Sequence, residues 1–271
     1  MLSQWESFLQ NLGIWVGSFT QFSPTGEELE NIPSRLHLEG LNNNQSARLT
    51  LQRQGGQDLV LELSTLSRSL LFFENGAFSQ GTIQFSPFSE FGAEFGLIYH
   101  NRRLRLVQLF DTNNNLRKLT LIREYREGTQ LNERPRLTID ALLGEWEGEA
   151  ITIYPDWREP SNFPTKMQLA MDSGGRLVQN TSFGDNPTLT SSATINGSIL
   201  NFDQNPQNPI QVLMLPDAAS ATFPIKAQLN QPLFLEIGWL LEPDLRQRMI
   251  RSYNDKGEWV SLTLVTERKV N

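Results

Sequence analysis

Six charged residues form the polar pattern best suited to hold a ligand, a glutamate followed by an Arg-x-Arg pair that occurs twice. The copies are Glu94 with Arg103 and Arg105, and Glu236 with Arg246 and Arg248. Side chains alternate along a strand, so the two arginines of a pair share one face, and a following strand can bring Glu94 near Arg105. Directed into a barrel, the arginines predict bidentate binding of a carboxylate, as in a fatty acid or tetrapyrrole. Directed outward, they predict cross-strand ion pairs worth about a few tenths of a kcal/mol.

Two further patterns are compatible with a ligand site. Arg-x-Tyr, the pair with which fatty-acid-binding proteins hold a carboxylate, occurs at 123–125 and 251–253. The copies fall on different strands, so chance explains them. A dense run of phenylalanines between Phe72 and Phe95 can line a pocket for a flat or lipidic ligand, although such residues more often fill a core.

The usual metal and enzyme signatures are missing from the sequence. It has no cysteine, which excludes thiolate nucleophiles and zinc-thiolate sites, and two distant histidines, His37 and His100, do not make a usual zinc site. It also lacks the G-x-S-x-G elbow, the phosphate-binding loop and G-x-G-x-x-G. We expect no metal and no cofactor, and binding rather than catalysis, although acidic residues leave acid–base catalysis open.

The net charge and the hydropathy of the sequence exclude some classes of binding partner. The net charge is −7 with a pI near 5.0, which argues against nucleic acid and anionic membrane surfaces. No apolar run approaches the ~20 residues of a membrane-spanning helix. The first residues, MLSQWESFLQNLG, lack the regions of a secretory signal. We expect a cytoplasmic protein without membrane insertion.

A short helix followed by Gly-x-Trp-x-Gly opens each half of the sequence. Ser3 and Glu6 have the spacing of a capping box, and the first motif follows at 13–17. A second helix is expected at 138–143, directly before the motif at 144–148. Most other segments are short apolar runs separated by turn residues, as in antiparallel sheets.

Further landmarks recur in the same order and indicate a duplication. LTLI precedes Glu124, and LTLV precedes Glu267 at the same distance. The polar stretch GTQLNERPRL separates the repeats. We therefore expect one domain over residues 1–128, a linker over 129–137, and a second domain over 138–271.

The order of these features resembles the lipocalin-like (calycin) superfamily. Three segments more specifically resemble a two-domain lipocalin-like family known mainly from cyanobacteria: FFENGAFSQG at 72–81, AEFGLIYHNRRLRLV at 93–107, and IYPDWREPS after the second motif. A related branch contains the S-type bilin lyases. The resemblance implies an all-β fold of two tandem antiparallel lipocalin-like β-barrels, each preceded by a short helix, and implies no activity.

The resemblance also implies a role for each motif tryptophan. In the superfamily this residue plugs the closed end of the barrel, and an arginine or lysine of the last strand covers it. The candidates are Lys118 or Arg123 for Trp15, and Arg268 or Lys269 for Trp146.

Three functions follow as hypotheses. The first is binding of a hydrophobic or amphipathic small molecule, such as a tetrapyrrole, a carotenoid-like molecule or a fatty acyl chain. The second, by analogy with the bilin lyases, is a chromophore lyase with a phycobiliprotein partner. The third is an interaction module whose barrels are filled and whose outer surface is functional.

Overall fold

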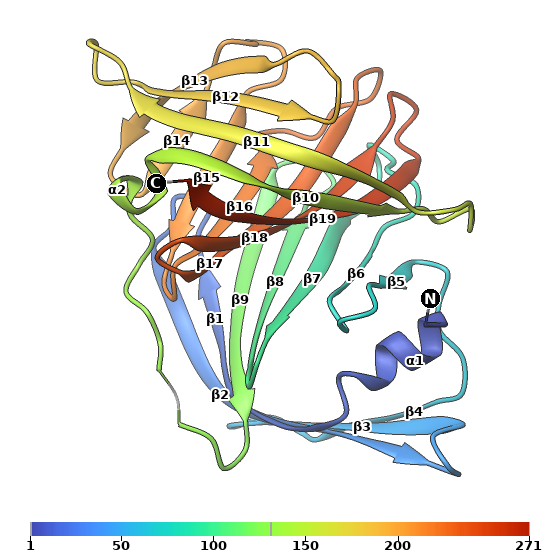
Figure 1. The fold of residues 1–271 in the computed structure, drawn as a ribbon. Helices are drawn as coiled ribbons and strands as arrows, with labels where there is room; N and C mark the ends of the chain where they lie inside the picture. The colour runs from blue at the N-terminus through green and yellow to red at the C-terminus, as the bar shows by residue number, and fades with distance from the viewer. Residues whose placement is uncertain (1, 131, 271) are drawn as a thin grey trace. The chain divides into compact units, whose positions relative to one another are not determined.

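The computed structural model describes residues 2–130 and 132–270. Leu131, which belongs to the expected linker, and the terminal residues Met1 and Asn271 lie outside this description. The chain folds into two antiparallel sheets, each preceded by a short helix (Figure 1), which confirms the predicted all-β class. None of the helices in the described residues is long and apolar enough to cross a membrane.

The first sheet follows helix α1 (Gln4–Leu9), which has the predicted capping box. The Ser3 hydroxyl accepts a hydrogen bond from the backbone N–H of Glu6, and the Glu6 carboxylate accepts one from the backbone N–H of Ser3. The strands are β1 (Gly13–Phe22), β2 (Glu28–Leu41), β3 (Ser46–Arg53), β4 (Leu59–Leu63), β5 (Leu70–Phe72), β6 (Phe78–Gly81), β7 (Phe91–Tyr99), β8 (Arg102–Phe110) and β9 (Leu116–Arg126).

The first sheet is a half-barrel rather than a closed barrel. Its strand order is β4-β3-β2-β1-β9-β8-β7-β6-β5, so β4 and β5 are edges. Strands β5 and β6 have only three and four residues, and residues 64–69 connect β4 to β5 without forming a strand. Among the described residues no strand pairs β4 with β5, so the sheet is open between these two edges.

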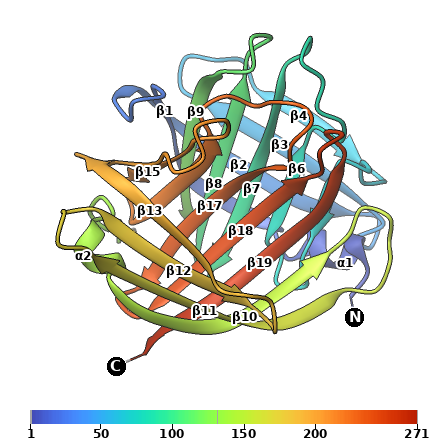
Figure 2. The ribbon, with the colours of Figure 1, turned by 90° about the horizontal axis from the view of Figure 1, so that it is seen from above.

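The second sheet closes into a barrel of strands β10 to β19, seen from above in Figure 2. Helix α2 (Ile139–Leu142) precedes it, with Thr138 as N-cap. The strands are β10 (Gly144–Ile153), β11 (Ser161–Met171), β12 (Leu177–Phe183), β13 (Leu189–Asn196), β14 (Ile199–Phe202), β15 (Ile210–Leu215), β16 (Ala219–Pro224), β17 (Leu233–Glu242), β18 (Leu245–Tyr253) and β19 (Trp259–Val270).

The Gly-x-Trp-x-Gly motif begins both sheets for the same steric reasons. Gly13 and Gly144 have φ of +121° and +117°, a region that residues with a Cβ rarely adopt. A Cβ on Gly17 would collide with the carbonyl oxygen of Arg123 in the neighbouring strand β9. Gly148 meets the carbonyl oxygen of Thr266 in β19 in the same way. Each motif therefore needs glycine at both of its ends.

Contacts divide the chain into two compact units. Unit 1 contains Met1–Gly81, Gly92–Leu109 and Lys118–Asn132, and unit 2 contains Thr82–Phe91, Phe110–Arg117 and Glu133–Asn271. Two segments from the first half of the sequence thus belong to unit 2, together with the closed barrel.

Candidate functional site

Four charged side chains meet inside the sheet of unit 1. On β8, Arg103 Nε lies 2.7 Å and Arg105 Nε 3.0 Å from the same carboxylate oxygen of Glu124 on β9. Arg105 Nη2 contacts the other Glu124 oxygen at 2.9 Å, and Arg105 Nη1 lies 2.7 Å from Glu94 on β7. The expected proximity of Glu94 and Arg105 is confirmed. Both arginines are buried, so the alternative of ion pairs on the outer wall is wrong.

Glu124 is the centre of this network. Burial alone would raise the pKa of its carboxyl, but the positive charges of Arg103 and Arg105 outweigh burial and lower the pKa to about 2. Burial lowers the pKa of Arg103, whereas the carboxylates of Glu124 and Glu94 outweigh burial at Arg105 and raise its pKa. Glu124 and Arg105 therefore remain charged at neutral pH.

Trp15 lies beside this network and is fully buried. Its indole N–H donates to the carbonyl of Asn11 at 2.9 Å, which ties β1 to the end of the preceding helix. The guanidinium carbons of Arg126 and Arg103 lie 4.0 and 4.4 Å from its ring centroid.

The expected cover of Trp15 by Lys118 or Arg123 is therefore wrong. Arg126 is the residue of β9 directly opposite Trp15, whereas Arg123 pairs with Ser18 and donates to the Thr20 hydroxyl. Lys118 comes earlier still in β9. The apolar runs of the last strand gave no way to fix this register from sequence.

A cavity of about 270 Å³ opens into the half-barrel of unit 1. Leucines of β2, β3 and β4 and the rings of Phe72 and Phe78 form its apolar walls, and Phe8 of α1 also contributes. Its polar lining consists chiefly of Asn11, Gln80, Glu94, Arg103 and Arg105. All three predicted site residues of the first repeat thus line one cavity.

Unit 2 repeats the four charges. Arg246 Nε and Arg248 Nε lie 2.6 and 2.9 Å from one oxygen of Glu267. Arg248 Nη1 lies 3.3 Å from Glu236, which also accepts a hydrogen bond from the Thr222 hydroxyl at 3.4 Å. The second set of predicted residues is therefore also brought together.

The pKa values of the two glutamates of unit 2 are shifted in opposite directions. Burial would raise the pKa of Glu267, but Arg246 and Arg248 outweigh it and lower the pKa to about 2. Burial prevails at Glu236 and raises its pKa, because Arg248 and Arg246 offset it only in part.

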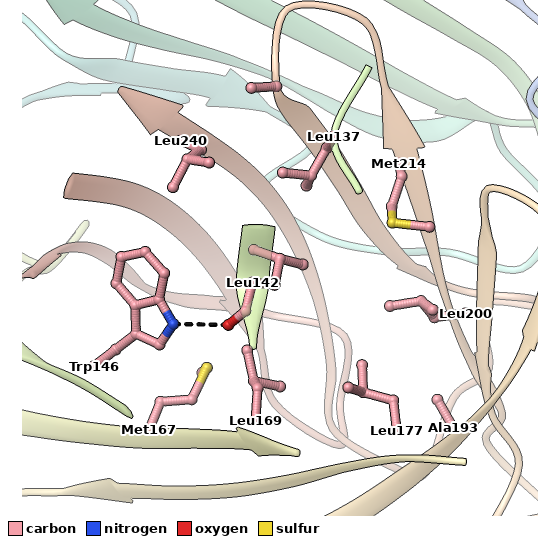
Figure 3. Close-up of a cluster of buried hydrophobic side chains, with 11 residues drawn as sticks. Leu137, Leu142, Trp146, Met167, Leu169, Leu177, Ala193, Leu200, Met214 and Leu240 are labelled. Atoms are coloured by element: carbon pink, nitrogen blue, oxygen red, sulfur yellow. Dashed lines mark hydrogen bonds between the residues drawn. The ribbon is translucent and has the colours of Figure 1, made fainter. Parts of the chain in front are cut away.

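Apolar side chains occupy the interior of the barrel around Trp146 (Figure 3). Its indole N–H donates to the carbonyl of Leu142 at 2.9 Å, the bond drawn in the figure. Lys269 Nζ lies 5.2 Å from the ring centroid, so of the two candidates for Trp146 the structure supports Lys269. The core around it consists of Leu137, Leu142, Met167, Leu169, Leu177, Ala193, Leu200, Met214, Ala218 and Leu240.

One position distinguishes the surroundings of the two arginine pairs. Asn11 and Leu142 occupy the same place before Trp15 and Trp146, since each accepts the indole hydrogen bond on its carbonyl. The Asn11 side chain accepts from Arg103 Nη1 at 3.2 Å and donates to the carbonyl of Gly76 at 2.9 Å. The unit 1 network is thus more polar than its counterpart.

The Arg-x-Tyr pair of the second half has a structural role. Arg251 is fully buried, its guanidinium carbon lies 3.4 Å from the ring centroid of Trp259, and its Nε donates to the Tyr253 hydroxyl at 2.8 Å. Both Arg251 Nη2 and the Tyr253 hydroxyl donate to the carbonyl of Thr82. The pair holds the segment 82–91 in unit 2. In the first half, Arg123 bonds to Thr20 instead.

The phenylalanines of the run between Phe72 and Phe95 lie in different environments. Phe72 and Phe78 line the cavity, and Phe85 and Phe91 pack together in unit 2 with Tyr253. Phe88 is 88% exposed. Among the described residues, no three His, Asp or Glu side chains are grouped to hold a metal ion.

Sequence reasoning missed three residues of the networks: Glu124, Glu267 and Asn11. The two glutamates were visible as repeat landmarks after LTLI and LTLV, and the alternation of those strands could have assigned them to the arginines. Asn11 carried no comparable signal, because its role depends on the helix end that presents it.

The sequence matches two known protein families, one in each half of the chain. Residues 133–270 match the C-terminal domain of Biogenesis factor required for ATP synthase 1, and residues 1–129 match the N-terminal domain of unknown function DUF3598. A search of curated proteins found no match.

Among solved structures, a protein of unknown function from the DUF3598 family of Nostoc punctiforme is 62% identical, covers all of both chains and has a TM-score of 0.97. This confirms the resemblance to a two-domain cyanobacterial family. The S-type phycobiliprotein lyase from Guillardia theta is 12% identical with a TM-score of 0.36, over 49% of this chain and 90% of that chain.

Proposed function

We propose that this protein, which belongs to the DUF3598 family, binds a hydrophobic or amphipathic small molecule in the cavity of unit 1. The single observation that carries the proposal is the combination of an apolar hollow with a buried arginine pair. Such a combination of apolar walls and a few placed polar groups is what ligand pockets share.

The volume of the cavity limits what it encloses. At about 270 Å³ it lies just below the ~300–1,000 Å³ typical of ligand pockets. An acyl chain of moderate length, or one ring of a tetrapyrrole or carotenoid-like molecule, suits this space. Between the unpaired edges β4 and β5 the lining consists of Thr65, Leu66 and Ser67, so a longer ligand would have to pass these residues.

Unit 2 supports the proposal by contrast. It has the same four charges, but buried leucines and methionines fill the interior beside them. We therefore assign binding to unit 1, and treat unit 2 as a structural counterpart with a filled interior.

The test is a titration of the full-length protein with decanoate, a carotenoid fragment and phycocyanobilin, by calorimetry and by displacement of an environment-sensitive dye. Leu49→Trp fills the cavity, because Leu49 lines it and is only partly buried. Leu29→Trp on the same sheet is the matched control, since Leu29 is 64% exposed. We expect at least one ligand to bind the wild type and the control, and to lose affinity for Leu49→Trp.

Two results would reject the function. One is that no ligand of the panel binds the wild type. The other is that Leu49→Trp binds as well as Leu29→Trp while both variants remain folded by circular dichroism.

A second candidate function concerns unit 2. Its filled interior, and the match of residues 133–270 to a domain of an ATP synthase biogenesis factor, favour an interaction module that acts through its outer surface. We expect the purified full chain to bind isolated ATP synthase subunits in a defined ratio by analytical ultracentrifugation. Absence of any complex at micromolar concentrations would reject this candidate.

A further inference from the structure

Arg103 has a donor that the protein leaves unused. The residue is 4% exposed and lines the cavity of unit 1. Its Nε and Nη1 are bound by Glu124 and Asn11, but Nη2 is buried and meets no acceptor in the described residues. Burying a charged donor without an acceptor is costly, so a ligand oxygen that reached Nη2 would gain a strong hydrogen bond.

The two carboxylates of the network differ in how firmly they are held. The Glu124 side chain is 1% exposed and contacts both arginines, with three hydrogen bonds. The Glu94 side chain is 27% exposed and makes one bond to Arg105, at Nη1. Glu94 can therefore turn away while Glu124 continues to hold both arginines.

The same positions in unit 2 lack these features. Arg246 Nη2 contacts Glu267 at 2.5 Å and the sulfur of Met167 at 3.0 Å. The Glu236 side chain, the counterpart of Glu94, is 11% exposed and has the Thr222 hydroxyl as a second partner. The unused donor and the loosely held carboxylate occur together in the unit that has the cavity.

We propose that the cavity of unit 1 is specific for a ligand with one carboxylate, which binds Arg103 Nη2 and takes the place of Glu94 on Arg105. This inference rests on the proposed function and names its ligand class. The ligand carboxylate enters as the Glu94 carboxylate turns away, so the negative charge beside the arginines stays the same. The apolar remainder of the ligand lies along Leu49, Leu61 and Leu63, which line the same cavity.

The test compares three ligands with one tail, decanoate, decanol and decylamine, on the full-length protein by calorimetry. We expect decanoate to bind about tenfold or more tightly than decanol, and decylamine to bind most weakly. Equal affinities of decanoate and decanol would overturn the head-group proposal while the binding function stands. If none of the three binds, decanoate has no site and the proposal is rejected. Should the carotenoid fragment or phycocyanobilin still bind, the proposed function survives this result.

Three variants test whether Glu94 itself competes with the ligand carboxylate, or whether any loss of negative charge has the same effect. Glu94→Gln removes the competitor, so we expect decanoate to bind about threefold or more tightly and decanol to be unaffected. Glu236→Gln makes the same change in unit 2 and should leave both affinities unchanged. Arg103→Lys keeps the charge but shortens the reach, and should abolish the preference for decanoate over decanol.

Weaker or unchanged decanoate binding by Glu94→Gln would contradict the exchange. So would an equal gain in Glu236→Gln. Thermal unfolding of each variant shows whether it is folded, and the comparison of ligands on the wild type decides the head-group question even if a variant fails to fold.

Discussion

At the scale of single residues, one buried carboxylate organises each unit. Glu124 bridges Arg103 and Arg105, and Glu267 bridges the corresponding pair. Two guanidinium groups this close repel each other in a medium of low dielectric constant, so each pair depends on the glutamate between them.

We predict that Glu124→Gln and Glu267→Gln each lower the free energy of unfolding by about 3–5 kcal/mol, because they leave two buried charges uncompensated. The control is Glu127→Gln, which breaks the exposed pair with Arg35 and should cost less than about 1 kcal/mol. Urea unfolding measures all three. Similar losses of unfolding free energy in all three variants would show that burial does not determine how much these ion pairs contribute to stability.

The same carboxylates predict the response of stability to acid. The pKa of Glu124 and of Glu267 is about 2 in the folded chain, below the ordinary value of 4.5. A carboxyl with a lowered pKa contributes stability above its ordinary pKa and loses it as pH falls toward the folded value. Wild-type melting temperature should therefore fall steeply from about pH 5 to pH 2.

Glutamine variants provide the check on this acid response. The melting temperature of Glu124→Gln should fall less steeply than that of the wild type over that range, since the variant has lost one of the two buried carboxyls whose pKa is lowered to about 2. Parallel curves for variant and wild type would contradict the assignment. Glu236 acts in the opposite sense, because its raised pKa makes its contribution decline as pH rises.

At the scale of elements, the first strand of each unit is fixed by close contact between backbones. We predict that Gly17→Ala and Gly148→Ala destabilise the fold by about 1–3 kcal/mol or more, because each new Cβ meets a carbonyl oxygen of the last strand. Gly56→Ala is the control, since its nearest atom would lie 3.7 Å away. Thermal melts compare the three, and a neutral Gly17→Ala would contradict the tight packing of β1 on β9.

Sequence predicted these first strands well, because glycine, tryptophan and the capping box act locally. Features that depend on how the strands pair with one another were harder to predict from the sequence. The sheet is open because β4 and β5 do not pair with each other, which no local signal in the sequence reveals. The cover of Trp15 by Arg126 follows from the register of β9 against β1, which apolar residues do not reveal either. The arginine pairs were found, but their shared glutamates were seen only as repeat landmarks.

At the scale of the whole molecule, the compact units do not follow the order of the chain. Segments 82–91 and 110–117 belong to unit 2, where Phe91 packs within 5.1 Å of Tyr253, measured between ring centroids. The backbone of Phe85 also donates to the carbonyl of Gly257, and Trp259 donates to that of Ile83.

We predict that Phe91→Ala destabilises unit 2, although residue 91 precedes the sequence of its barrel. The loss should be about 3–5 kcal/mol, as for other buried phenylalanines. Hydrogen exchange should show lost protection in β18 and β19 and unchanged protection in β2 and β3. Phe88→Ala is the control, because Phe88 is 88% exposed and should change stability by less than about 0.5 kcal/mol.

The late partners of segment 82–91 have a consequence for biosynthesis. A ribosome makes Phe85 and Phe91 long before it makes Tyr253 and Trp259, so the nascent chain carries two large apolar side chains whose cover has not yet been translated. If the first half folds during synthesis, it therefore exposes an apolar surface that is covered only when the rest of the chain has been made. Chaperone capture should be strongest for translation intermediates that end before residue 253.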